Sequence, residues 1–100
     1  MYARVTELAG FGDRLDEYLE RVREQVLPRL REAAGYEGYV NLVDREGDRV
    51  LVVSLWRSRE EMRASRDLVV RLREQAAGSV GAGERWVREY EVALHEAGQA

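Results

Sequence analysis

Apolar and polar residues alternate with a period of two in four stretches of the chain, a pattern typical of β-strands. The four stretches are residues 2–8, 36–44, 50–56 and 85–95. In residues 50–56 the alternation is unusual because both sets are largely apolar: Leu51, Val53 and Leu55 on one side, and Val50, Val52, Ser54 and Trp56 on the other. Both faces of this strand are therefore expected to be covered, as in a central strand.

Two further stretches have the 3.6-residue period of amphipathic helices. The first runs from an Asp13 cap towards Gly35, a residue suited to a left-handed helix end, and Pro28 predicts a kink or short break near residues 24–27. The second begins at Ser58, three residues before Glu61, which is the spacing of a capping box, and extends to about Ala77.

The resulting order is β-α-β-β-α-β, with a glycine-bearing turn at residues 45–48 joining the second and third strands. Right-handed crossovers turn this order into an α+β, ferredoxin-like fold: a four-stranded antiparallel sheet with both helices on one face. We expect residues 1–100 to form one domain, because the length suits a single modest core.

One face of such a sheet carries no helix. We expect the helices to cover the face of Ala3, Val5, Val40, Leu42, Leu51, Val53 and Leu55. The uncovered face would then carry Arg4, Thr6, Leu8, Tyr39, Asn41, Val43, Val50, Val52, Ser54 and Trp56, with Glu89 and Glu91. Such a large, partly apolar surface predicts a homodimer, in which two facing sheets enclose a cleft suited to a small molecule.

Composition excludes several classes of function. The formal charge of −3 comes from interspersed signs, which gives no basic stripe for nucleic acid, and the absence of cysteine removes disulfides, thiolate metal sites and thiol nucleophiles. No apolar run approaches the roughly 20 residues that span a bilayer, and the N-terminus enters a strand pattern instead of a signal peptide. We therefore expect a cytoplasmic protein with no membrane partner.

Several motifs resemble the antibiotic biosynthesis monooxygenase-like family of dimeric α+β barrels. The resemblance covers residues 2 to about 94, and its most specific piece is the join Trp56-Arg57-Ser58-Arg59-Glu60-Glu61-Met62 between the third strand and the second helix. Further matching runs are Gly35-Tyr36-Glu37-Gly38-Tyr39, Leu42-Val43-Asp44 and Tyr90-Glu91-Val92. The resemblance implies a homodimer whose sheets pack together.

Members of this family include cofactor-independent oxygenases of aromatic polyketides and quinols, a haem-degrading branch, and proteins with no known activity. The haem-degrading branch carries Asn on the first strand, Trp at the end of the third and His on the second helix. Here Trp56 matches, but Thr6 lies near the first position and no His occurs in residues 58–77. We therefore expect no haem and no other cofactor.

Cofactor-free oxygenation needs an apolar pocket for an electron-rich phenol or hydroquinone, a group that removes its proton, and donors that stabilise the resulting oxyanion. The donor candidates are Trp56, Asn41 and Arg4. Tyr39 and Tyr90 are the candidates for proton transfer, although parity separates Tyr90 from the others. The expected substrate-binding residues are Tyr39, Thr6, Ser54, Val52 and Tyr90.

Each candidate also has a structural explanation. Trp56 could be a packing residue of the core or interface, Asn41 could bond neighbouring backbone, and Arg4 could pair with Glu91 on the adjacent strand. Two alternatives to an enzyme remain: a non-catalytic dimer that binds a small ligand, and an assembly module whose pocket is filled by Trp56 and Tyr39 themselves.

Overall fold

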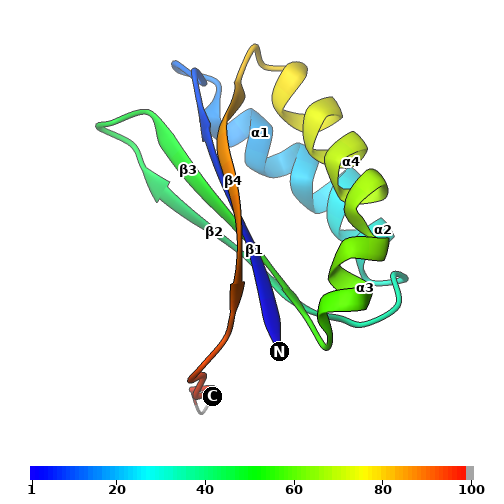
Figure 1. Ribbon diagram of the computed structural model, residues 1–100. Coiled ribbons are helices and arrows are strands. Elements are labelled where there is room, and N and C mark those ends of the chain that lie inside the picture. Colours follow the sequence, from blue (N-terminus) through cyan, green and yellow to red (C-terminus); the bar gives the residue numbers. More distant parts are fainter. Residues whose placement is uncertain (99–100) are drawn as a thin grey trace.

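Four antiparallel strands form one sheet in the computed structural model, which describes residues 1–98. Their order is β2-β3-β1-β4, with bounds Tyr2–Ala9 for β1, Tyr36–Asp44 for β2, Arg49–Trp56 for β3 and Gly83–Glu91 for β4. All the helices lie on one side of this sheet (Figure 1). The predicted ferredoxin-like fold is confirmed, although the last strand ends at Glu91 instead of reaching residue 95.

The first helical arm contains the predicted interruption. It consists of α1 (Leu15–Arg21), a π-helical turn η1 (Val22–Val26) and α2 (Leu27–Leu30). Pro28 lies in the first turn of α2, where an N–H group would have no partner within that helix, so its absence costs little free energy. The π-helical turn before it accommodates the change in hydrogen bonding. Two details differ from expectation: Arg14, not Asp13, is the N-cap, and the arm ends at Leu30, so that Gly35 (φ +80°) belongs to the turn into β2.

The second helical arm begins at the predicted cap and is divided once. The Ser58 hydroxyl accepts a hydrogen bond from the Glu61 backbone N–H at 3.1 Å and opens α3 (Arg59–Ala64). Ser65 separates α3 from α4 (Arg66–Gly78), and its hydroxyl donates to the Met62 carbonyl at 2.8 Å. A side chain that bonds to a preceding carbonyl is a known cause of helix bending.

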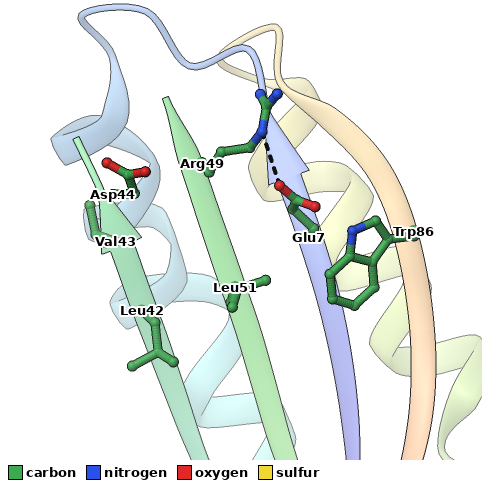
Figure 2. A pocket seen from close by; sticks show the side chains of 7 residues that line it. All are labelled: Glu7, Leu42, Val43, Asp44, Arg49, Leu51 and Trp86. Atoms are coloured by element: carbon green, nitrogen blue, oxygen red, sulfur yellow. Dashed lines mark ion pairs between the residues drawn. The ribbon is translucent and has the colours of Figure 1, made fainter. Parts of the chain in front are cut away.

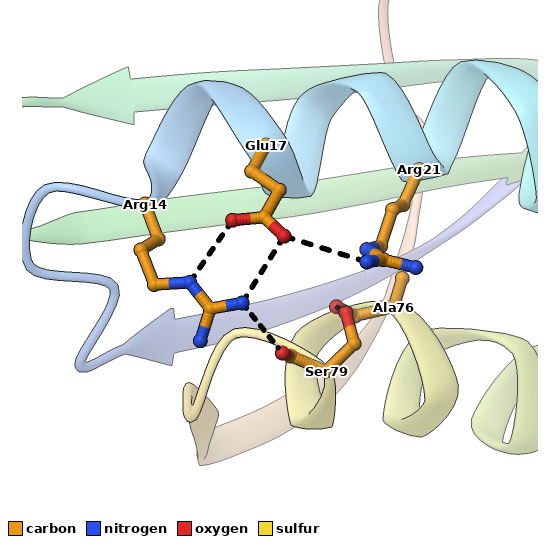
Figure 3. A network of polar contacts seen from close by, with 5 residues as sticks. All are labelled: Arg14, Glu17, Arg21, Ala76 and Ser79. Atoms are coloured by element: carbon orange, nitrogen blue, oxygen red, sulfur yellow. Dashed lines mark hydrogen bonds and ion pairs between the residues drawn. The ribbon is translucent and has the colours of Figure 1, made fainter.

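Hydrogen bonds and ion pairs connect the two helical arms to each other (Figure 3). Arg14, just before α1, donates to the Glu17 carboxylate at 2.9 Å and to the backbone carbonyl of Ser79 at 3.0 Å, at the end of α4. Arg21 approaches the same carboxylate at 3.4 Å. These contacts are exposed, so they position the helix ends more than they stabilise the fold.

The helices cover the face opposite to the one expected. Trp56 and Val50 are fully buried, and they belong to a core cluster that includes Tyr18, Leu30 and Met62 of the helical arms. On the other face, Val40 and Leu42 are 43% and 52% exposed. Alternation determines which residues share a face, but the side that the crossovers cover follows from packing, and here the helices pack on the larger side chains.

Candidate functional site

Five of the predicted site residues lie together on the helix-covered face of β1 and β3. All are at most 5% exposed: Arg4, Thr6, Val52, Ser54 and Trp56. They therefore lie between sheet and helices, and not in a cleft between two sheets as expected. The assignment to the uncovered face is wrong for all of them, because that assignment placed the helices on the smaller aliphatic side chains.

Strand register adds Tyr39 and Asn41 to this group. Arg4 on β1, Ser54 on β3 and Tyr39 on β2 are aligned across the sheet. The next row on the same face contains Thr6, Val52 and Asn41. Seven of the eight predicted residues thus share one surface, which we call the inner face.

Tyr90 does not belong to the inner face. It is paired with Ala3, which alternates with Arg4, and its side chain is 46% exposed. The period of two along β4 separates Tyr90 from Glu89, the residue opposite Arg4. Tyr90 therefore lies on the bare face of the sheet. Its separation from the other candidates is confirmed, but the expectation that its parity would place it on the helix side is wrong, because the helices cover the opposite face.

Trp56 is enclosed by the core. Its exposed fraction is 0%, its indole N–H donates to the Ser54 hydroxyl at 2.9 Å, and the Tyr36 ring packs edge-on against it with centroids 5.9 Å apart. The indole N–H, which could have donated a hydrogen bond to a ligand, is thus already paired within the protein. In this conformation Trp56 is a wall of the inner face.

Arg4 has hydrogen-bonding capacity that the chain leaves unused. Its Nη2 donates to the Met62 carbonyl at 2.7 Å and lies 3.8 Å from a carboxylate oxygen of Glu89. Within residues 1–98, Nη1 is buried without a hydrogen-bond partner. The predicted pair with Glu91 is wrong, because the register places Glu89 opposite Arg4 and Glu91 opposite Tyr2.

Burial lowers the pKa of the Arg4 guanidinium, whereas the Glu89 carboxylate raises it. The nearby charges of Arg73 and Arg66 act in the same direction as burial. A guanidinium with an ordinary pKa above 12 keeps its charge at neutral pH despite this. The inner face therefore contains the buried positive charge of Arg4, which the Met62 carbonyl and the Glu89 carboxylate at 3.8 Å compensate in part.

Asn41 and two tyrosines form the other polar part of the inner face. In the described chain, the side-chain oxygen of Asn41 is buried and lacks a hydrogen-bond partner. Burial raises the pKa of Tyr39 to about 12 and also raises the pKa of Tyr18. Hydrogen bonding to the Asn41 amide acts in the opposite direction and lowers both pKa values in part. Tyr39 is therefore protonated at neutral pH and can donate a hydrogen bond, but it is a poor base.

Arg73 is a buried polar residue that the sequence analysis missed. It is 6% exposed, and its guanidinium donates to the Thr6 hydroxyl at 3.2 Å and to the Glu84 carboxylate at 2.6 Å. Its position four residues after Val69, another buried residue of α4, was the available signal. Thr6 is therefore already engaged by a side chain of this molecule.

The layer between sheet and helices opens at the β4 edge. A hollow of about 620 Å³ lies there, lined by Arg4, Arg63, Arg66, Val87, Arg88 and Glu89. Val87 is opposite Thr6 in the register, yet its side chain is 38% exposed. We call this hollow the edge groove, and it is the approach from solvent to Arg4.

The bare face has a hollow of its own, of about 430 Å³ (Figure 2). Its lining residues are Glu7, Leu42, Val43, Asp44, Arg49, Leu51 and Trp86. Glu7 and Arg49 form an ion pair at 2.9 Å, and the Arg88 guanidinium lies 4.6 Å from the centre of a Trp86 ring. This hollow shares no lining residue with the inner-face candidates.

Two structural features are absent from residues 1–98. No three His, Cys, Asp or Glu side chains gather there in a way that could hold a metal ion. Nor does that part of the chain contain a helix with the length and apolar character needed to cross a bilayer.

Sequence comparison identifies the family. The profile of the family described as Antibiotic biosynthesis monooxygenase matches residues 1–77, and the chain therefore belongs to this family, as its motifs indicated. The chain is 36% identical over 93 residues to the uncharacterized protein Rv2557 of Mycobacterium tuberculosis and 37% identical over 94 residues to the uncharacterized protein Rv2558. These matches cover 93% and 94% of this chain but only 41% and 39% of the relatives, so the chain spans about two fifths of their length.

Solved structures share the fold at low sequence identity. The haem-degrader MhuD of M. tuberculosis, solved with two haems in its active site, gives a TM-score of 0.75 at 19% identity, covering 97% of this chain and 100% of that one. A dimeric ferredoxin-like protein from an uncultured marine organism gives 0.72 at 14% identity, covering 97% and 99%. Similarity at this level of identity is evidence for the fold alone.

Proposed function

We propose that the chain forms a homodimer through the bare face of its sheet. Val40, Leu42 and Tyr90 are each more than two fifths exposed on that face, an unfavourable surface for an isolated domain. In Figure 2 the side chains of Leu42, Leu51 and Trp86 project from this face while the helices lie behind the sheet. A solved structure with the same fold is described as a dimeric ferredoxin-like protein, which supports a dimer here.

We further propose that the inner face, entered from the edge groove, binds a small aromatic, polyketide or quinol substrate and that the chain oxygenates it without a cofactor. The observation that carries this proposal is the pair of unsatisfied polar atoms in the layer, Arg4 Nη1 and Asn41 Oδ1. Buried polar atoms are normally paired, so two unpaired atoms on one surface suggest the place of a missing ligand. Family membership supplies the class of reaction.

The reaction can be written with molecular oxygen as the only oxidant. For an anthrone-type substrate, an activated CH₂ group loses a proton to water, the carbanion adds O₂, and the peroxide anion takes a proton back from water. The resulting hydroperoxide loses water to leave a carbonyl. One oxygen atom enters the product and the other leaves as water. The substrate supplies all the electrons, so the protein has only to bind the substrate and stabilise its anion.

In this proposal Arg4 stabilises the substrate oxyanion and Asn41 orients the substrate through its free oxygen. Trp56 and Val52 form the wall against which the aromatic rings pack. Tyr39, which is protonated at neutral pH, donates a hydrogen bond instead of accepting the proton. Thr6 and Ser54 hold their neighbours Arg73 and Trp56 in place.

A haem-dependent activity is not proposed for this chain. Its single histidine is His95, which follows β4 and is not on the second helical arm. The helices α3 and α4 therefore offer no imidazole to an iron facing the inner face. The haems of the similar solved structure are a property of that protein.

The second candidate function is a non-catalytic dimer that binds a ligand or assembles without one. The specific observation in its favour is the complete burial of Trp56, whose N–H is already bound to Ser54. An inner face filled by its own side chains would need to open before a substrate could reach Asn41. The two candidate functions therefore differ in whether the layer between sheet and helices opens and in whether the protein converts a substrate.

Oxygen uptake distinguishes them. We expect the protein to consume O₂ with at least one member of a panel of anthrones and naphthohydroquinones, and the Trp56→Phe variant to lose most of this rate while remaining dimeric. Trp86→Phe, the same substitution on the bare face, is the matched control and should keep the rate. A panel member that raises the melting temperature with no oxygen uptake would instead establish the binding module.

A further inference from the structure

The edge groove has a charge opposite to that of the whole chain. The chain carries a formal charge of −3, but the groove is lined by the arginines Arg4, Arg63 and Arg66 and a single carboxylate, that of Glu89. Arg88 also borders the groove, but its guanidinium lies over the Trp86 ring of the bare face. These three arginines come from different elements: Arg4 from β1, Arg63 from α3 and Arg66 from α4. Tertiary structure therefore assembles this cationic surface, and no local run of basic residues produces it.

One of these arginines is buried and incompletely paired. Arg4 is 3% exposed, and its Nη1 has no hydrogen-bond partner within residues 1–98. A guanidinium has five N–H donors in a planar fork that fits a carboxylate, so the incompletely paired guanidinium of this groove-lining residue has a specific complement. This differs from the exposed arginines of the helix faces, which water can solvate.

Glu89 shows what kind of group fits between these arginines. One oxygen of its carboxylate lies 3.8 Å from Arg4 Nη2, and the other lies 3.6 Å from Arg63 Nε. Both distances exceed those of good hydrogen bonds, so the carboxylate spans two guanidiniums without binding closely to either. A side chain that is 35% exposed can leave such a position at little cost.

We propose that the edge groove binds a small organic dicarboxylate, one carboxylate of which displaces Glu89 and pairs with Arg4 and Arg63. The second carboxylate then neutralises Arg66 at the groove wall. The hollow of about 620 Å³ lies within the range of small-molecule sites. Glu89 acts as an internal competitor that occupies the site when the ligand is absent.

Arg4 is common to this site and to the proposed oxygenase site, but the present inference concerns binding and does not require turnover. Titration calorimetry with phthalate as the probe therefore tests it independently of oxygen uptake. We expect saturable binding of one phthalate per chain, at least tenfold weaker binding of benzoate, and none of the neutral phthalamide. Absence of phthalate binding, or equal affinity for inorganic phosphate, would overturn the dicarboxylate site.

Charge variants test the position of the site. The double variant Arg63→Gln/Arg66→Gln should weaken phthalate binding at least tenfold. The matched control, Arg23→Gln/Arg71→Gln, removes two positive charges from exposed helix positions outside the groove and should change affinity less than twofold. Equal losses in both double variants would mean nonspecific attraction and would contradict the proposal.

Glu89→Gln gives the most discriminating result, because it removes the competitor without removing a binding group. We expect phthalate to bind at least threefold tighter to this variant. Glu91→Gln changes the net charge equally on the same strand, outside the groove, and should alter the affinity less than twofold. Unchanged or weaker binding to the Glu89→Gln variant would show that Glu89 does not occupy the ligand position.

Discussion

The two faces of the sheet differ in an unexpected way: the inner face buries polar groups within the hydrophobic core, and the bare face exposes aliphatic ones. The inner face buries Arg4, Thr6 and Ser54 at no more than 3% exposure. The bare face exposes Leu42 and Val40. Polar groups are thus enclosed within the core of the inner face, while some aliphatic side chains of the bare face meet water, although burial normally favours the opposite placement for both.

This contrast indicates that the two faces serve different purposes. Aliphatic side chains on a flat, helix-free surface are stabilised by a second sheet, which needs no polar chemistry. Buried polar groups on the inner face cost free energy unless they are paired, and Arg4 and Asn41 each have an unpaired atom in the described chain. We therefore expect the bare face to determine assembly and the inner face to determine ligand chemistry.

The largest expected effect comes from removing the central side chain of the inner face. Trp56→Ala should lower the free energy of unfolding by about 3–5 kcal/mol, because a fully buried aromatic ring leaves a cavity. Chemical denaturation followed by circular dichroism measures this loss. Trp86→Ala, on the bare face, should cost clearly less, and equal losses would contradict the assignment of the core to the inner face.

The next effect concerns assembly through the bare face. Leu42→Glu should raise the dimer dissociation constant about 100-fold or more, because each interface would bury two unpaired carboxylates at a cost of several kcal/mol. Sedimentation equilibrium measures the change. Leu94→Glu is the control, since that side chain is 90% exposed beyond β4. A wild-type chain that is monomeric at high concentration would remove the basis for the proposed dimer.

A smaller effect is expected from alkaline pH. The pKa of Tyr39 is raised to about 12 in the folded chain, so between pH 10 and 12 the unfolded chain loses this proton while the folded chain keeps it. The resulting stability is complete below pH 10 and is lost as the pH rises towards 12. Tyr39→Phe should make the fall in unfolding free energy shallower over this range. An identical slope in the variant would argue against burial of the Tyr39 hydroxyl.

The smallest expected effect tests the unpaired oxygen of Asn41. Asn41→Val should change the unfolding free energy by less than about 1 kcal/mol, because it removes a buried polar atom that the described chain leaves unsatisfied. Ser54→Val should cost about 1–3 kcal/mol, because it deprives the Trp56 indole of its acceptor. Equal costs would mean that Asn41 has a structural partner. Loss of ligand binding with retained stability in Asn41→Val would support its role in the site.

Much of the local structure follows from the sequence. The Ser58 cap, the interruption before Pro28 and the pairing of residues 36–44 with 49–56 all depend on contacts between residues close in the chain. The grouping of Arg4, Thr6, Ser54 and Trp56 on one face also follows, because alternation along each strand is local. Arg73 could not be placed with Thr6 in this way, because its position depends on helix docking. Glu89 was assigned to the face of Arg4, but its position directly opposite Arg4, where Glu91 was expected, depends on the register of β4.

By itself, the sequence determined the elements, their order and which side chains share a face of each strand. Only the tertiary structure decided which of the two faces the helices cover, and hence that Trp56 is enclosed while Leu42 is exposed. The physical reason is that a strand's alternation is symmetric between its two sides, whereas the packing of α1, α3 and α4 on the sheet is a single global choice. The outcome depends on the volumes and contacts of all the side chains together, and a local sequence pattern does not contain this information.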